Sequence, residues 1–288
     1  MRGPKRCLCA LLILVGFVPP LQAEDDTGWN FWGRFSGSSN SSGLVLKADP
    51  SLGYKFSQYF STYAGLPIYF VNESNTVTTS SGFLNGIGNA YVGVRLGVDH
   101  PAVNFASNLV LTAPTGDKDK GFSTGRATVD WTNSFNRRFS AVMPFASIGV
   151  ANTVSDTSFF VRPFSSLGLV GHVEGGATIS LSQFIDVGAS AYGVRASGQQ
   201  RIISKVLKHQ SPTSPATSNP GSRGNGKNRV FETSAETVGP ADIANDHGFS
   251  TWFGFSPRSR VDFQIGYTRS VSYDLDTLFF GVGFRFGK

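Results

Sequence analysis

The segment GHVEGG (171–176) brings His172 and Glu174 within two residues of each other. A histidine oriented by a carboxylate can serve as the base of a hydrolase when a nucleophile lies within hydrogen-bond reach. Both residues fall on the polar face of an alternating segment, and the sequence assigns no serine to them as a partner. We therefore expect a polar pair without covalent chemistry, and the chain is predicted not to be an enzyme.

Asp117 and Asp119 raise the second question, which is metal binding. A calcium loop needs roughly six to eight oxygen ligands at regular spacing, and a zinc site needs three or four ligands. Lys118 and Lys120 alternate with the two carboxylates and oppose a cation. We expect no metal and no cofactor.

The surrounding segment, VLTAPTGDKDKGFSTGR (110–126), changes from apolar to charged within a few residues. A membrane-embedded strand must make this change where it leaves the hydrocarbon. We expect the strand to end near Ala113-Pro114, with the charged loop outside the cell. The alternative is a polar hairpin tip on a soluble protein.

The elements that carry these residues alternate between apolar and other side chains with a period of two, as in NAYVGVRLGV (89–98). This period predicts β-strands rather than helices. About twelve are expected, over 29–37, 43–56, 59–71, 87–98, 102–114, 126–136, 139–151, 166–181, 184–198, 248–256, 260–271 and 273–286.

The predicted connections alternate between short and long. Longer ones fall at 72–86, 115–125, 152–165 and 199–247, with short turns between them. Short periplasmic turns and long outer loops are typical of outer-membrane barrels, and an even strand count places both termini on the periplasmic side. The fold class is therefore an all-β, transmembrane, antiparallel up-and-down barrel. A soluble barrel or sandwich with an apolar interior is the alternative. Glycines on the polar face and aromatic residues at the strand ends favour the membrane barrel.

The N-terminal residues have the features of a secretory leader. Lys5 and Arg6 precede an apolar run at 7–18, and LQA (21–23) fits a cleavage site. We expect 1–23 to be a signal peptide and 24–288 to be the barrel. Both cysteines lie in the leader, and without it the formal charge falls from +6 to +3. Nucleic-acid binding is not expected.

The polar face of the strands would line the lumen. The candidate lumen and solute-contact residues are Arg34, Lys47, Asp49, Tyr91, Arg95, Asp130, His172, Glu174, Asp262 and Arg285. One interpretation is a mixed-charge passage for solutes, and the other is a set of ion pairs that fills a narrow barrel. Twelve strands lie between the roughly eight that side chains fill and the roughly sixteen of open porins.

The loop 199–247 contains two different parts. RIISKVLKH (201–209) has apolar residues at helical spacing and could form a short amphipathic helix. Residues 210–228 are rich in Pro, Ser and Gly, which predicts disorder. We expect an extracellular, partly disordered loop. A constriction folded into the pore and a lipopolysaccharide contact are the alternatives.

The residues also resemble a known family. LTAPTGDKDKGFSTGRATVDWTNSF (111–135) and PFASIGVANT (144–153) are similar to Gram-negative outer-membrane transporters of the phenol meta-pathway type. The similarity lies in Pro114-Thr115-Gly116-Asp117, followed by Asp130 and Trp131, and extends over about 87–200 and the last three strands. It implies an outer-membrane barrel. One departure is Gly287-Lys288, which follow the aromatic residue on which such barrels usually end.

The expected function is passive uptake of small solutes across the outer membrane, with aromatic or hydrophobic compounds suggested by the resemblance. A closed barrel with a structural role at the cell surface and a lipid-modifying enzyme are the alternatives. The expected partners are outer-membrane lipid and lipopolysaccharide, the barrel-assembly machinery and the solutes themselves.

Overall fold

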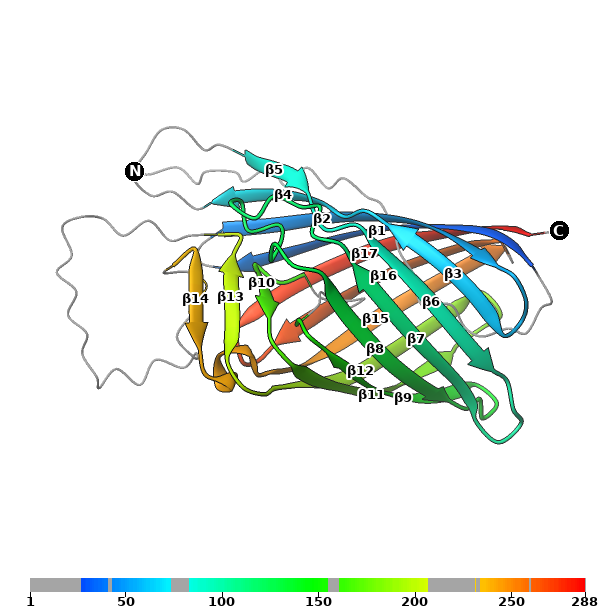
Figure 1. The fold of residues 1–288 in the computed structure, drawn as a ribbon. Coiled ribbons are helices and arrows are strands. Elements are labelled where there is room, and N and C mark those ends of the chain that lie inside the picture. Colours follow the sequence, from blue (N-terminus) through cyan, green and yellow to red (C-terminus); the bar gives the residue numbers. More distant parts are fainter. Residues whose placement is uncertain are drawn as a thin grey trace, which may run out of the picture.

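The computed structural model describes residues 27–40, 43–73, 83–154, 161–206, 231, 234–258 and 260–287. Most of them belong to one antiparallel sheet that β1 closes by pairing with both β17 and β2 (Figure 1). Its strands are β1 (Gly28–Asn40), β2 (Gly43–Lys55), β3 (Phe60–Gly65), β4 (Ile68–Glu73), β5 (Phe83–Ile87), β6 (Tyr91–Val98), β7 (Asn104–Thr112), β8 (Thr128–Asn136), β9 (Val142–Ala151), β11 (Val170–Ser180), β12 (Ile185–Ala196), β15 (Asp246–Arg258), β16 (Val261–Ser270) and β17 (Leu275–Gly287).

These fourteen strands make a barrel of twelve, because two of the twelve are interrupted. β3 and β4 both pair with β2 and are separated only by Leu66 and Pro67. Proline has no N–H for the ladder, so the strand breaks there. β5 and β6 pair with β4 and β3 and form the second interrupted strand. Each of the twelve predicted strands is present, with ends shifted by a few residues, which confirms the predicted fold class.

The connections show the expected asymmetry. Gly28, the first residue of β1, lies opposite both Lys55 and Gly287. The start of β1 and the end of β17 therefore lie on the same side of the barrel as the short turn that follows β2. Figure 1 shows β13 (Gln200–Ser204) and β14 (Glu236–Gly239) at the other end of the barrel. The β16–β17 turn (271–274) lies at the same end as β13 and β14, and it is a short connection. A 3₁₀-helix, η1 (Ala241–Ala244), lies in the same region. Within the described ranges, no helix is long and apolar enough to span a membrane.

The outer surface of the barrel is apolar. Leucine, isoleucine, valine and phenylalanine side chains are exposed on nearly every strand, among them Leu96, Leu111, Ile148, Ile265 and Leu278. In the part of the chain that the structure describes, no second layer covers them. A soluble protein rarely exposes an apolar patch of more than a few hundred Å². The apolar face must therefore meet lipid, which excludes the soluble barrel with an apolar interior.

Most rings that point into the lumen lie over a glycine on the neighbouring strand. Tyr63 lies opposite Gly93, and a Cβ atom on Gly93 would overlap the Tyr63 ring. The same direct cross-strand relation joins Tyr91 to Gly65, Trp32 to Gly283, Trp252 to Gly188, Tyr192 to Gly248, Phe279 to Gly266 and His172 to Gly149. The glycines seen on the polar face of the sequence therefore make room for the rings.

Gly93→Ala should destabilise the barrel, because the new methyl group forces the Tyr63 ring from its place. Gly97 is the matched control, since it lies on the same face of β6 and an added Cβ would meet only the Phe105 carbonyl at 3.8 Å. We expect a loss of about 1–3 kcal/mol for Gly93→Ala and little change for Gly97→Ala. Urea unfolding of the refolded barrel, followed by heat-shifted gel mobility, measures both. Equal effects would contradict the packing argument.

Candidate functional site: the lumen and its outer mouth

The ten candidate residues all occupy lumen-facing positions of the strands, and contact with a solute remains a prediction. Asp49 on β2 forms an ion pair with Lys47 (3.2 Å) and accepts a hydrogen bond from the Tyr91 hydroxyl (3.0 Å). Asp262 on β16 is bound by Arg285 and by the Ser256 hydroxyl. These contacts neutralise part of the wall charge.

His172 and Glu174 do not form the pair expected from their spacing. His172 Nε2 lies 3.2 Å from Asp130 Oδ1, and the Thr132 hydroxyl donates to the same carboxylate oxygen at 2.8 Å. Residues two apart on a strand are separated by about 7 Å. Across β9, in contrast, Gly149 has no side chain, and His172 reaches over it to β8.

Glu174 has a different partner, the Ser190 hydroxyl, which donates to it at 2.6 Å. No serine hydroxyl of the described residues is hydrogen-bonded to His172. The geometry therefore holds a fixed polar group on the lumen wall.

The lumen charges are separated by sign around the barrel. The wall formed by β1 to β7 carries Arg34, Lys47, Lys55 and Arg95 against two carboxylate residues, Asp49 and Glu73. The wall formed by β8 to β17 carries Asp130, Glu174, Asp186, Asp246 and Asp262 against Arg285, with His172 beside Asp130. Opposite charges on facing walls produce a field across the lumen.

The charged loop after β7 fastens itself to the interrupted strand β5–β6. The Thr115 hydroxyl donates to the Gly88 carbonyl (3.1 Å) and accepts the Ala90 N–H (2.8 Å), and Asn89 accepts the Gly116 N–H (3.1 Å). β7 ends at Thr112, close to the expected end near Ala113-Pro114.

Asp117 has a structural role in this loop. Its carboxylate accepts the N–H groups of Asp119 and Lys120, and Lys120 Nζ lies 3.6 Å away. The described residues contain no group of three histidine, cysteine or acidic side chains placed to bind a metal.

Beyond this turn the loop enters the barrel mouth. Phe122 is almost fully buried and stacks on Tyr69 of β4 with ring centroids 5.4 Å apart. Gly121, at φ +74°, passes so close to the Ser204 backbone that no Cβ atom would fit. The sequence feature that could have indicated this contact is Phe122, a single phenylalanine between Gly121 and Gly125 in a polar loop.

A small three-stranded sheet of β10 (Phe164–Leu167), β13 and β14 lies in the same mouth. Residues 200–204 form β13, so the amphipathic helix expected at 201–209 is wrong for this part. β10 and β14 pair with both edges of β13 and take its backbone hydrogen bonds, which overrides the local helical spacing. Residues 207–230, which include the segment expected to be disordered, lie outside the described residues.

The three-stranded sheet and its loops enclose an apolar core. Its members are Val45, Tyr69, Val71, Phe122, Val161, Phe164, Ile202, Val206, Phe231, Tyr273 and Leu275. Burial raises the pKa of the Tyr273 phenol, which donates to the Ile243 carbonyl at 2.6 Å. Side chains from the wall and from the loops thus pack together in the outer mouth.

Buried polar contacts tie opposite walls together through this core. Arg162 forms an ion pair with Asp246 of β15 (2.9 Å), and both side chains are inaccessible to solvent. Tyr192 and Ser270 also donate to Asp246, at 3.2 and 2.5 Å. These residues were not among the sequence candidates, because Arg162 and Asp246 are 84 residues apart and only the closed barrel brings them together.

Lys205 continues the connection to the other side. Its ammonium group donates to the carbonyls of Arg162 (3.1 Å) and Phe164 (2.9 Å) and lies 5.0 Å from the centre of the Tyr69 ring. In the strand order, four strands separate β15 from β4 one way around the barrel and six the other way. The contacts from Asp246 through Arg162 and Lys205 to Tyr69 therefore cross the mouth near its full width. We call these four residues the mouth tie.

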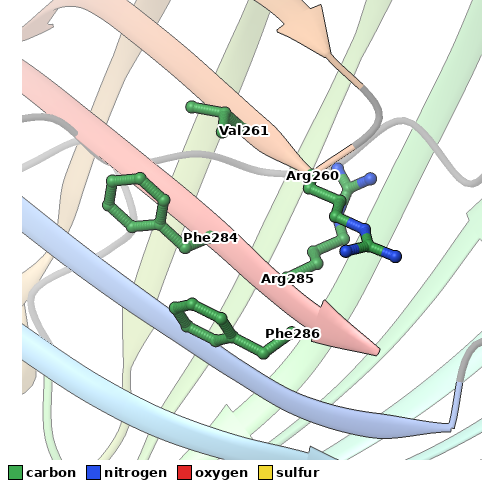
Figure 2. A pocket seen from close by; sticks show the side chains of 5 residues that line it. All are labelled: Arg260, Val261, Phe284, Arg285 and Phe286. Atoms are coloured by element: carbon green, nitrogen blue, oxygen red, sulfur yellow. The ribbon is translucent and has the colours of Figure 1, made fainter. Parts of the chain in front are cut away.

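A shallow pocket of about 380 Å³ lies at the opposite rim, lined by Arg260, Val261, Phe284, Arg285 and Phe286. Figure 2 shows the rings of Phe284 and Phe286 along the end of β17, with Arg260 and Arg285 toward its tip. Aromatic rings beside basic groups suit the boundary between hydrocarbon and lipid headgroups. This pocket lies at the rim, where the lipid-facing rings of Phe284 and Phe286 meet Arg285 from the lumen side.

Comparison with known proteins identifies the architecture. No protein-family model and no curated protein matches the sequence. Among solved structures, the chain is similar to an outer membrane channel from Pseudomonas putida F1, with 10% identity, a TM-score of 0.57, and coverage of 94% of this chain and 98% of that one. It is also similar to the NanC porin, with 8% identity, a TM-score of 0.51, and coverage of 89% and 100%. The chain has the fold of an outer-membrane barrel. At these identities the likeness extends to the fold alone.

Loss of one partner of the buried pair should release the mouth loops. In Arg162→Ala, Asp246 stays buried without its counter-charge, a change that costs about 3–5 kcal/mol in comparable pairs. We expect trypsin to cleave after the buried Lys205 at least a hundred times faster than in the wild type. Glu236→Gln is the control, because Glu236 makes only exposed ion pairs with Lys118 and Arg201. Limited proteolysis with mass spectrometry follows this bond, and unchanged cleavage in Arg162→Ala would contradict the mouth tie.

Proposed function

We propose that the protein is an outer-membrane channel for the passive passage of small solutes. The observation that carries this proposal is the water-accessible charge on the lumen wall. The side chains of Asp130 and His172 retain 21% and 24% of their accessible surface, and that of Arg285 retains 32%. A barrel filled by its own ion pairs would leave these groups dry. Export by the leader and insertion by the assembly machinery belong to the same proposal.

Passage requires a change at the outer mouth, because the apolar core and the mouth tie occupy it. Loops are the least stable parts of a fold and are the usual sites of opening. The mouth loops are fixed to the wall by a few buried polar contacts, and the ion pair of Arg162 with Asp246 is one of them. We propose that displacement of these loops connects the lumen to the outside.

The solute class follows from the lumen surface. Rings of Trp32, Tyr63, Tyr91 and Trp252 line the wall among charged and hydroxyl groups, and all four are partly accessible. Such a surface suits small molecules with one apolar or aromatic part and one polar part. The resemblance to transporters of the phenol meta-pathway type supports the same class.

A closed barrel with a structural role at the cell surface is the second candidate. The observation that favours it is the burial of Phe164, Phe231 and Arg162 in the mouth, which resembles the core of a soluble protein. In that case lipopolysaccharide and outer-membrane lipid would be the partners of the loop end.

Single-channel recording separates the two candidates. We expect the refolded wild type to give stable current steps in a planar bilayer, and Arg162→Ala to be open for at least ten times longer because its mouth is released. Arg201→Ala, which removes an exposed ion pair, should behave as the wild type. If wild type and Arg162→Ala are both folded by gel mobility yet silent, the barrel is closed and the structural role holds.

A further inference from the structure

Two arginines on the basic wall of the lumen have no carboxylate partner. Arg34 lies on β1 and Arg95 on β6, both with partly accessible side chains. Within the described residues, neither guanidinium group makes a hydrogen bond or an ion pair, and Asp99 affects Arg95 only as a longer-range charge. A guanidinium group that is partly desolvated and unpaired attracts an anion from solution.

The carboxylates of the lumen do not supply that anion. Asp49 is held by Lys47 and Tyr91, although it lies directly opposite Arg34 on the neighbouring strand. Asp130 is engaged by His172 and Thr132. Asp186, which has no described hydrogen-bond partner, lies on the acidic wall with Asp262.

Two tyrosines occupy the wall between the arginines. The rings of Tyr63 and Tyr91 meet edge to face with centroids 6.2 Å apart. Tyr63 is within electrostatic range of both arginines, and Tyr91 is within range of Arg34. Their hydroxyl groups are engaged with Asn108 and Asp49, so the ring surfaces are what remains for a ligand.

We propose that Arg34, Arg95, Tyr63 and Tyr91 form a binding site for a small aromatic carboxylate within the lumen. Arg95 aligns across β3 and β2 with Gly28, six residues along β1 from Arg34, so a carboxylate binds one guanidinium group at a time. The ring of the ligand packs on the tyrosine beside that arginine, Tyr91 for Arg34 and Tyr63 for Arg95. The acidic wall from β8 to β17 repels the anion towards this site. The site deepens the proposed function, because it defines which of the small solutes would be retained during passage.

The test measures binding separately from conduction. Benzoate is titrated into the refolded barrel in detergent and followed by saturation-transfer NMR, with benzamide as the uncharged analogue and acetate as the carboxylate without a ring. We expect benzoate to bind at least ten times more tightly than either. Equal binding of benzamide and benzoate to the wild type would overturn the proposal without any variant.

The variants locate the site. The double variant Arg34→Gln/Arg95→Gln should weaken benzoate binding at least tenfold. Arg195→Gln is the matched control, because it removes the same charge from an exposed position outside the lumen. Unchanged binding in the folded double variant would refute the site.

Failure of the site and failure of the channel give different results. A barrel that conducts but does not bind benzoate loses the site and keeps the proposed function. A silent barrel that binds benzoate through the two arginines keeps the site and loses the channel.

Discussion

The closure of twelve strands into one sheet is the constraint on which the rest of the structure depends. A barrel of twelve strands has a lumen that is too wide for single side chains to fill. The same lumen is too narrow for large side chains to extend across it without contact. The chain meets this constraint by placing a glycine directly across from most lumen rings, as with Tyr63 over Gly93 and Trp252 over Gly188. The rings then lie along the wall and leave water access to charged groups such as Asp130.

The same closure decides how charge is distributed. Strands that are neighbours in the sequence are neighbours in the barrel, so basic residues in the first part of the chain gather on one wall. Asp49 and Glu73 are the carboxylate residues of that wall among the described strands, and Lys47 and Tyr91 already hold Asp49. The unpaired state of Arg34 and Arg95 is therefore a consequence of strand order as well as of local contacts.

The sequence predicts the barrel well because a period of two reports directly which side chains face lipid. Arg95 and Tyr91 could be assigned to the lumen from alternation alone, and Pro114 follows the end of its strand closely. Partners across the lumen could not be predicted. His172 meets Asp130 rather than Glu174 because Gly149 lies between them, and β13 is a strand because β10 and β14 flank it. These outcomes depend on register and closure, which a local pattern does not contain.

The outer mouth combines two kinds of packing that are usually separate. Wall residues such as Val45 and Leu275 belong to membrane strands, yet they pack against Phe164 and Ile202 as in a water-soluble core. Such a core is stabilised by apolar burial, which does not require an exact geometry, whereas the Asp246–Arg162 pair does. Opening the mouth therefore need not unfold the barrel: the strands keep their own ladder, and only the contacts that the loops make with the wall have to be exchanged for water.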